Sequence, residues 1–355
     1  MAVRGFFSTP GPLVGAWALV LLVVFGGALT LELTYQDPSA PVLREPTAEV
    51  RAPAQEPLQR TRPAVSGSEI LQSEEAIAEA EVASEIQRSR RAAAGLTESS
   101  EYGPLPRRAA DGREPWQVYA RPFAVDPSTP YIAIIITGLG LNRSVTDSAI
   151  DLLPPEVTLA FSPYGSHLDV YTRQAAETGH ETLLMVPMEP LEYPNDDPGP
   201  ETLLTSLSPK DNRERLHKVM ASFTGYVGAI NDMGSRFTAS REAIEPVLSE
   251  LRSRGVMFVD ARTTRFTVAA RSADSLGTVR AFNNRFIDNT AAAESIDRQL
   301  EDLETLAKAV GFAVGIGRAY PVTIERVIAW SDLLAQKDIE LAPITAAANR
   351  QIINQ

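Results

Sequence analysis

The sequence predicts an α/β fold in which a parallel β-sheet carries helices on its outer face. Along residues 131–343, continuous apolar runs alternate with stretches that have helical periodicity. Such alternation indicates parallel strands, because parallel neighbours are joined by helical crossovers rather than by tight turns. Helix boundaries agree with this pattern: Ser208-Pro209 suits a helix start, and Gly255 and Gly311 suit helix ends. We therefore predict a closed (β/α) barrel or a strongly curved parallel sheet with outer helices.

Residues 12–31 form an uncharged stretch long enough to cross a bilayer. About 20 helical residues match the roughly 30 Å of hydrocarbon. Arg4 precedes the stretch and Glu32 is the first charged residue after it, which favours a short cytoplasmic N-terminus at residues 1–11. We predict a single-pass inner-membrane anchor with a periplasmic C-terminal domain. A cleaved signal peptide is the alternative, because Gly26-Gly27-Ala28 supplies small residues, but its apolar core would be unusually long.

Residues 32–126 are predicted to be a disordered tether rich in Pro, Ala and Glu. Large apolar residues are few there, so burial would not offset the entropy of ordering. One helix is possible at residues 73–94, capped by Ser73 and ended by Gly95. It would be a solvated, partly formed helix or, alternatively, a coiled-coil or partner-binding helix. The folded domain is then expected at residues 127–355.

Within that domain, strands are expected where short apolar runs stand between polar or turn-forming residues. They are Tyr131–Ile136, Val157–Phe161, Thr182–Val186, Gly225–Ile230, Val256–Val259, Phe312–Ile316 and Glu340–Pro343. Helices are expected where apolar residues recur at helical spacing. They are Ser144–Leu152, His167–Thr178, Ser208–Ser222, Arg241–Ser253, Ala293–Val310 and Val322–Gln336.

Composition excludes several classes of function. A formal charge of -12 argues against a nucleic-acid partner. The chain has no cysteine, which excludes disulfides, thiolate catalysis and zinc–cysteine sites. The three histidines, His167, His180 and His217, lie in helical or turn contexts and are predicted to be surface residues. No serine lies in a nucleophile elbow, so serine hydrolysis has no support.

Several polar residues follow predicted strands directly. Thr137-Gly138, Pro187-Met188-Glu189, Asn231-Asp232 and Asp260 stand at four such positions. The carboxyl ends of parallel strands meet at one edge of the sheet, so these residues are expected to share one mouth.

Five stretches in this region resemble motifs of the divergent polysaccharide deacetylase family, whose relatives remove acetyl groups from amino sugars. They are residues 134–140, 184–190, 231–238, 259–263 and 315–321. The resemblance covers about 129–347 and implies a polysaccharide-deacetylase-like fold. It also implies a divalent metal such as zinc, held by acids and histidines.

This chain departs from the family pattern at the positions that carry the chemistry. Thr137 and Gly138 replace two acids, and Met185, Asp232 and Arg318 replace three histidines. Threonine and glycine are poor metal ligands, methionine is a soft one, and arginine is a fixed cation. We therefore expect no metal cofactor, and an ion pair between Arg318 and Asp232 in the place of the metal.

The catalytic candidates that remain are Asp232, Asp260 and Glu189. Together they could hold a hard cation, but a salt-bridge network with Arg236 and Arg262 is the favoured alternative. Candidates for substrate binding are Arg236, Arg262, Thr137, Asn231 and Tyr320. Arg236 could clamp a carboxylate or sugar hydroxyls, or it could orient loops, which we favour. Asp288 and Asn289 match a further family motif and are expected to cap the helix that begins near Ala293.

Three functions are compatible with this sequence. The leading hypothesis is a glycan-binding or scaffolding pseudoenzyme of cell-envelope carbohydrate metabolism. The second is an active carbohydrate esterase that removes N- or O-acetyl groups with rearranged ligands. The third is a protein–protein module in envelope assembly. The expected partners are accordingly a cell-envelope glycan or an envelope protein.

Overall fold

The computed structural model describes residues 93–124, 126 and 128–353. The predicted membrane span at 12–31 lies outside these residues, as do positions 73–92 of the possible helix. Within the described part of the chain, no helix is both long and apolar enough to cross a membrane.

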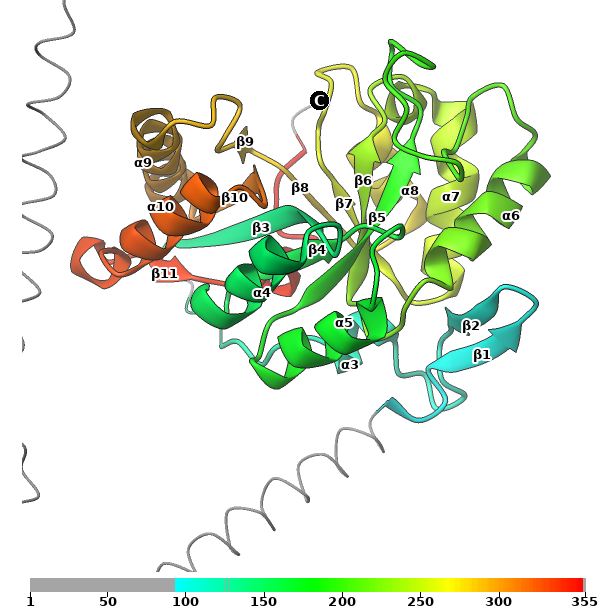
Figure 1. The fold of residues 1–355 in the computed structure, drawn as a ribbon, viewed down its shortest axis with the longest axis horizontal. Coiled ribbons are helices and arrows are strands. Elements are labelled where there is room, and N and C mark those ends of the chain that lie inside the picture. The colour runs from blue at the N-terminus through cyan, green and yellow to red at the C-terminus, as the bar shows by residue number, and fades with distance from the viewer. Residues whose placement is uncertain (1–92, 125, 127, 354–355) are drawn as a thin grey trace, which may run out of the picture. The chain divides into compact units, whose positions relative to one another are not determined.

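The core of the domain is a curled parallel sheet (Figure 1). Its strand order is β8-β7-β6-β5-β4-β3-β10-β9, with β11 paired to β3. The strands are β3 (Tyr131–Leu139), β4 (Thr158–Phe161), β5 (Thr182–Met188), β6 (Gly228–Met233), β7 (Met257–Asp260), β8 (Arg280–Phe282), β9 (Arg285–Phe286), β10 (Phe312–Arg318) and β11 (Glu340–Leu341). The predicted parallel sheet is thus confirmed, and the short strands β8 and β9 are additions to the prediction.

Two consecutive strands, β8 and β9, lie at opposite edges of the sheet. β8 pairs with β7 at one edge, and β9 pairs with β10 at the other. Between them, the Asn283 N–H donates to the Asp260 carbonyl and the Asn284 N–H donates to the Val314 carbonyl, both across 2.9 Å. One short stretch of chain therefore bridges β7 and β10, which accounts for the strong curvature.

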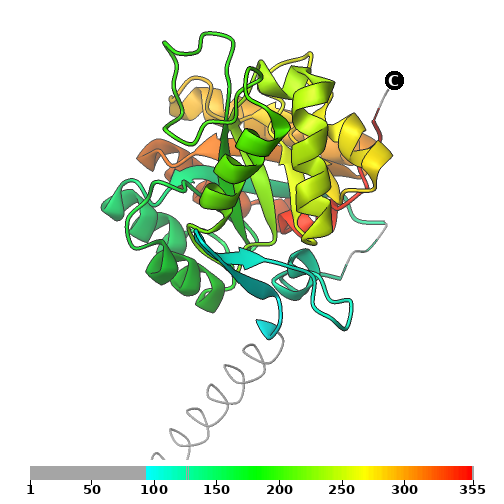
Figure 2. The ribbon, with the colours of Figure 1, turned by 90° about the vertical axis from the view of Figure 1, so that its right-hand side faces the viewer.

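Helices cover the outer, convex face (Figures 1 and 2). They are α4 (Arg143–Leu152), α5 (Leu168–Glu177), α6 (Pro209–Met220), α7 (Arg241–Ser253), α8 (Ala269–Leu276), α9 (Ala293–Val310) and α10 (Pro321–Ser331). The six predicted helices are present, although the last ends at Ser331, and a 3-10 turn, Leu334–Lys337, follows it. The sequence prediction missed α8.

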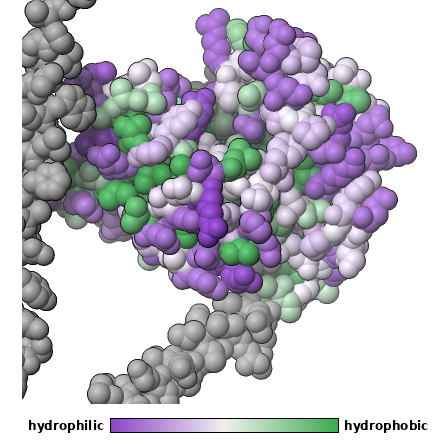
Figure 3. Space-filling view, in the orientation of Figure 1, coloured by the Kyte–Doolittle hydropathy of each residue, from purple (hydrophilic) through white to green (hydrophobic). Residues whose placement is uncertain are grey.

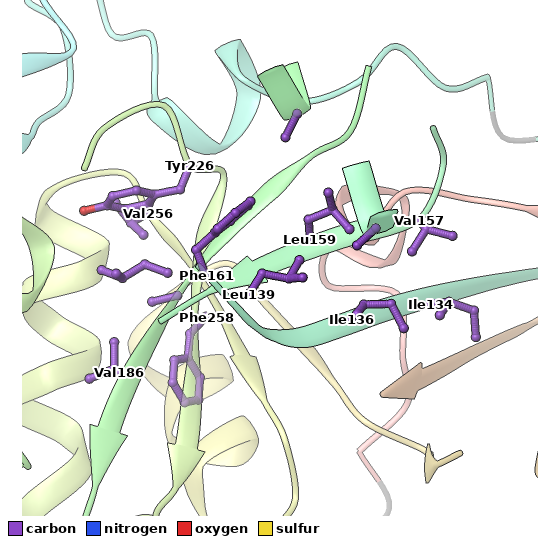
Figure 4. Close-up of a cluster of buried hydrophobic side chains, with 14 of the residues drawn as sticks. Ile134, Ile136, Leu139, Val157, Leu159, Phe161, Val186, Tyr226, Val256 and Phe258 are labelled. Atoms are coloured by element: carbon purple, nitrogen blue, oxygen red, sulfur yellow. The ribbon is translucent and has the colours of Figure 1, made fainter. Parts of the chain in front are cut away.

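The sheet separates two apolar clusters because successive side chains of a strand point to opposite faces. Ile134 and Ile136 of β3 pack under the helices with Leu159 and Phe161 of β4 (Figure 4). Ile135 instead belongs to the cluster on the concave face. That cluster also contains residues of the 3-10 turn Ile344–Ala347.

The predicted boundary of the domain at residue 127 is wrong. Residues 97–106 form an antiparallel hairpin of β1 (Thr97–Ser100) and β2 (Gly103–Pro106), drawn in cyan at the foot of the domain in Figure 2. Leu96 and Leu105, on either side of this hairpin's turn, are fully buried. A short helix, α3 (Pro115–Val118), follows.

Polar contacts fix the same segment to the domain. Arg254 at the end of α7 pairs with Glu98 across 2.8 Å and donates to the Pro106 carbonyl across 2.9 Å. Arg121 pairs with Glu156 across 2.7 Å. The average composition of residues 32–126 concealed this part, because a few apolar residues suffice where the domain supplies their partners.

The surface prediction for the histidines holds only for His167. His180 is 5% exposed, and its two ring nitrogens lie 2.8 and 3.2 Å from the carbonyl oxygens of Val157 and Ile150. His217 is partly buried and lies 2.7 Å from a carboxylate oxygen of Glu250. Both are structural residues of the helical layer.

Candidate functional site

The structure brings the substituted motif positions together around one cavity at the carboxyl ends of the strands. The cavity has a volume of about 320 Å³ and is lined by residues of β3, β5, β6 and β10. Four of the five positions line it: Thr137, Met185, Asp232 and Arg318. The fifth, Gly138, contacts one of these four residues: its backbone N–H donates to Sδ of Met185 across 3.1 Å.

β3 is irregular at the two positions where the family has its acids. Its register with β4 shifts between Ile136 and Leu139. Gly138, inside this bulge, has a φ of 84°, where glycine has no steric penalty. The Thr137 hydroxyl donates to the Gly317 carbonyl across 3.1 Å and so joins β3 to β10. Neither residue presents an acid to the cavity.

The lining of the cavity combines apolar and polar side chains. Met185, Ile230 and Ile316 are buried strand residues. The polar lining residues include Asp196, Ser235 and Asp232. Asp196 comes from the long loop after β5, which projects from the top of the molecule and is largely hydrophilic on the visible face (Figure 3).

The predicted ion pair between Asp232 and Arg318 is wrong. Among the described residues, no carboxylate oxygen lies within 4 Å of the Arg318 side chain, which is exposed. Arg318 nevertheless acts on Asp232 over a longer distance. Burial raises the pKa of Asp232 to about 6, and attraction to the Arg318 cation opposes this rise. The guanidinium sits at the end of β10, where it can keep its hydration.

Asp288 has a different role from the one predicted. Its Oδ2 accepts hydrogen bonds from the backbone N–H of Arg318 across 2.6 Å and from the Thr323 hydroxyl across 2.9 Å. The N-cap of α9 is Ala292, without a side-chain cap. Asp288 therefore fixes the turn between β10 and α10, which positions Arg318 at the cavity.

Asp260 and Glu189 do not join Asp232. Asp260 is fully buried, and its oxygens accept hydrogen bonds from the backbone N–H of Arg262 and from the Thr267 hydroxyl, each across 2.9 Å. Glu189 accepts from the backbone N–H and the hydroxyl of Thr205 across 2.6 and 2.7 Å. Both carboxylates are engaged in holding loops, so the residual oxygen cluster considered from the sequence does not form.

The residues present do not fit a zinc site. Zinc needs three protein ligands and an open position. Asp232 and Asp196 are the carboxylates that line the cavity, and its other polar groups are hydroxyls, an amide and a guanidinium. In the described part of the chain, no group of three or more His, Cys, Asp or Glu side chains could hold a metal ion.

Two of the proposed substrate-binding residues orient loops. Arg236 donates to the Leu191 carbonyl across 2.8 Å and lies 3.6 Å from Glu189, so it supports the loop after β5. Asn231 accepts from the Ala261 N–H across 2.8 Å and donates to the Met233 carbonyl across 2.7 Å. Its amide therefore joins the ends of β6 and β7.

Tyr320 and Arg262 are not among the residues that line this cavity. Tyr320 is exposed at the start of α10, and Arg262 lines a neighbouring cavity. Asp196 and Phe286 do line the site and were missed. Asp196 lies in a long loop without hydrophobic periodicity, so the sequence pattern could not predict that this loop returns to the cavity.

The pH dependence of Asp232 tests this description of the cavity. Its folded-state pKa of about 6 lies above the ordinary 3.8, so the stability contributed by the neutral carboxyl is complete below pH 3.8 and is lost as the pH rises through 6. Arg318→Gln removes an opposing cation and should raise this pKa further. Carboxyl-carbon NMR titration measures it, with Arg173→Gln on exposed α5 as the control. An unchanged midpoint in Arg318→Gln would refute the coupling.

Comparison with known proteins identifies the family through its sequence model. The sequence model of the divergent polysaccharide deacetylase family matches residues 134–348. The uncharacterized protein YibQ of Escherichia coli is 26% identical over 219 residues, which are 61% of this chain and 67% of that one. An uncharacterized protein of Haemophilus influenzae is 25% identical over 193 residues, covering 54% and 68%. The crystal structure of the uncharacterized protein ATU2773 from Agrobacterium tumefaciens is 37% identical, with a TM-score of 0.67, and covers 69% of this chain and 99% of that one.

Proposed function

The chain belongs to the divergent polysaccharide deacetylase family, and from this premise we propose that its domain binds an acetylated cell-envelope glycan without hydrolysing it. The observation that carries the proposal is the set of side chains around the cavity. The backbone frame of the motifs surrounds it, while threonine, glycine, methionine and arginine stand at four of the five positions where the family has ligands and acids.

Hydrolysis of an acetamide requires an activated water, a base and an acid for the leaving amine. The Thr137 hydroxyl is engaged with the Gly317 carbonyl. Gly138 and Met185 stand where the family has an acid and a histidine, and here the Gly138 N–H donates a hydrogen bond to the Met185 sulfur. Asp232 is the one carboxylate among the five positions. A single carboxylate could accept a proton, but among the described residues no group of three or more His, Cys, Asp or Glu side chains could hold a metal ion to activate the water.

The same cavity suits binding of a sugar. Its apolar lining at Met185, Ile230 and Ile316 offers a surface for an acetyl methyl group or a ring face. Asp232 can accept hydrogen bonds from an amide N–H or from hydroxyls. Burial of an acetyl group against thioether and aliphatic carbons gives a reason to prefer an acetylated sugar.

In this proposal the chain is a single-pass protein of the inner membrane, with its domain on the periplasmic side. The support is the uncharged stretch at residues 12–31 and the acidic residue that follows it. Protease added to spheroplasts should then digest the domain, whereas a protected full-length chain would count against this placement.

Glycan binding is tested with two neutral hexasaccharides that differ in the acetamido group. The full-length protein should bind the hexamer of N-acetylglucosamine about tenfold more tightly than cellohexaose, because the cavity buries the acetyl methyl and pairs the amide. Asp232→Asn should weaken binding of the acetylated hexamer about tenfold, since a hydrogen bond to a charged acceptor is lost.

Calorimetric titration of both sugars measures these affinities. Asp151→Asn, an exposed acid on α4, provides a control with the same change of charge. Equal affinity for the two hexamers would contradict the proposal. Release of acetate during the titration would instead support the esterase alternative.

A further inference from the structure

A second cavity lies beside the first and shares its wall. Its volume is about 500 Å³. The loop after β7, drawn in yellow near the C-terminal end in Figure 1, contributes lining residues to both cavities. Along this loop Ala261 and Thr263 line the first cavity, while Arg262 and Thr264 line the second. Phe286 lines both. A ligand of a few sugar rings could therefore reach across the shared wall.

The second cavity is strongly basic within an acidic protein. Four arginines line it, although the whole chain has a formal charge of -12. They are Arg262, Arg265, Arg271 and Arg285. One acid lines the cavity, Asp260, and its carboxylate is fully buried and bound by backbone and hydroxyl donors. The accessible charge of this cavity is therefore positive.

Three of these arginines form no close ion pair with a described carboxylate, although the buried Asp260 attracts the Arg262 guanidinium. Arg285 lies 3.3 Å from Asp302. For Arg262, Arg265 and Arg271, no ion pair within 4 Å is formed with any described residue. The guanidinium donors of these three are available to a ligand.

The arginine at the centre of the wall is held in place before any ligand arrives. The Arg262 guanidinium carbon lies 3.7 Å from the centre of the Phe282 ring, and that of Arg280 lies 5.9 Å from the same ring. Arg280 is itself anchored by Asp274 across 2.8 Å. A stacked guanidinium loses little freedom when it binds a carboxylate, and its fork suits two parallel hydrogen bonds.

We propose that this arginine cavity, formed by Arg262, Arg265 and Arg271, binds a carboxylate carried by the same glycan whose acetylated sugar occupies the first cavity. The inference rests on the proposed function and narrows its ligand to an acidic, acetylated polysaccharide. Such a polymer places both groups within a few sugar rings of each other, which matches two cavities that share the loop 261–264 and Phe286.

The test compares the hexamer of N-acetylglucosamine with the same hexamer carrying carboxymethyl groups. At low salt the full-length protein should bind the carboxymethylated hexamer about tenfold more tightly, the typical gain from one charge-assisted pair. Arg265→Gln/Arg271→Gln removes two exposed cations, leaves Arg262 in place, and should reduce this preference. Arg173→Gln/Arg298→Gln, on α5 and α9, is the matched control and should keep it.

Three results would overturn the inference: equal affinity of the wild type for both hexamers, an undiminished preference in Arg265→Gln/Arg271→Gln, or tighter binding of inorganic phosphate than of a simple carboxylate. If neither hexamer binds, the proposed function fails, and a titration with citrate still decides on the arginine cavity. Citrate should shift the NMR signals of the Arg262 side chain in the wild type, at lower concentrations than in the double variant. Unshifted signals would contradict the site.

Discussion

Restoring all five substituted positions is expected to turn the cavity into a metal site. The variant Thr137→Asp/Gly138→Asp/Met185→His/Asp232→His/Arg318→His should take up about one zinc per chain that EDTA removes. The reason is geometric. Four of these positions already line one cavity, and Gly138 contacts Met185 beside it. Histidines and acids placed there would converge without any rearrangement of the strands.

Room for the new side chains is available at the most constrained position. A Cβ atom built on Gly138 meets no other atom within 4 Å. The φ of 84° makes an aspartate there strained by about 1 kcal/mol, a cost that Asp tolerates better than most residues. The five-fold variant should therefore fold, with a somewhat lower melting temperature than the wild type.

The matched control keeps Thr137 and Gly138 and changes only Met185, Asp232 and Arg318 to histidine. It provides the three nitrogen ligands without the acids, so it should bind zinc more weakly than the five-fold variant and release no acetate. Elemental analysis after gel filtration, with circular dichroism to verify folding, measures the outcome. A folded five-fold variant that takes up no zinc would show that the motif positions do not converge as the structure has them.

A chain that begins at Thr129 is expected to unfold at least about 10 °C below a chain that begins at Ala93. Removing residues 93–128 exposes the surfaces that bury Leu96 and Leu105, each worth roughly 2 kcal/mol. It also removes Glu98, the partner of Arg254. A loss of about 5 kcal/mol corresponds to a shift of 10–20 °C in a domain of this size.

Calorimetry of the two chains measures this loss, and point variants localise it. Leu105→Ala alone should lower the free energy of unfolding by about 2–4 kcal/mol, whereas Leu152→Ala, at a side chain that is 60% exposed, should change it little. Equal melting temperatures for the two chains would show that the hairpin contributes nothing to the fold.

An element can be predicted from the sequence when its own residues determine it, and not when distant residues supply its partners. β3 and β10 were predictable because their own apolar runs require burial on both faces. β8 contains Arg280, which is 5% exposed only because Asp274 and the distant Gln351 carbonyl accept its hydrogen bonds. A local sequence pattern therefore cannot predict this strand. The hairpin at 97–106 was hidden for the same reason, since α6 and α7 supply its partners.

The same distinction separates the site residues that could be placed from the sequence from those that could not. The order of motifs along a parallel sheet sufficed to gather Thr137, Met185, Asp232 and Arg318 at one edge. It did not indicate that Asp260 turns away to bind the start of α8, because that helix was itself missed. Nor could it give the rotamer of Arg318, whose exposed side chain makes no pair with Asp232.

The most direct test of a binding function without hydrolysis is the metal content and acetate release of the wild-type, full-length protein. We expect no stoichiometric divalent metal and no acetate from the hexamer of N-acetylglucosamine, even with added zinc, because the cavity offers Asp232 and Asp196 where zinc needs three ligands. About one zinc or manganese per chain, removed by EDTA together with measurable acetate release, would contradict it.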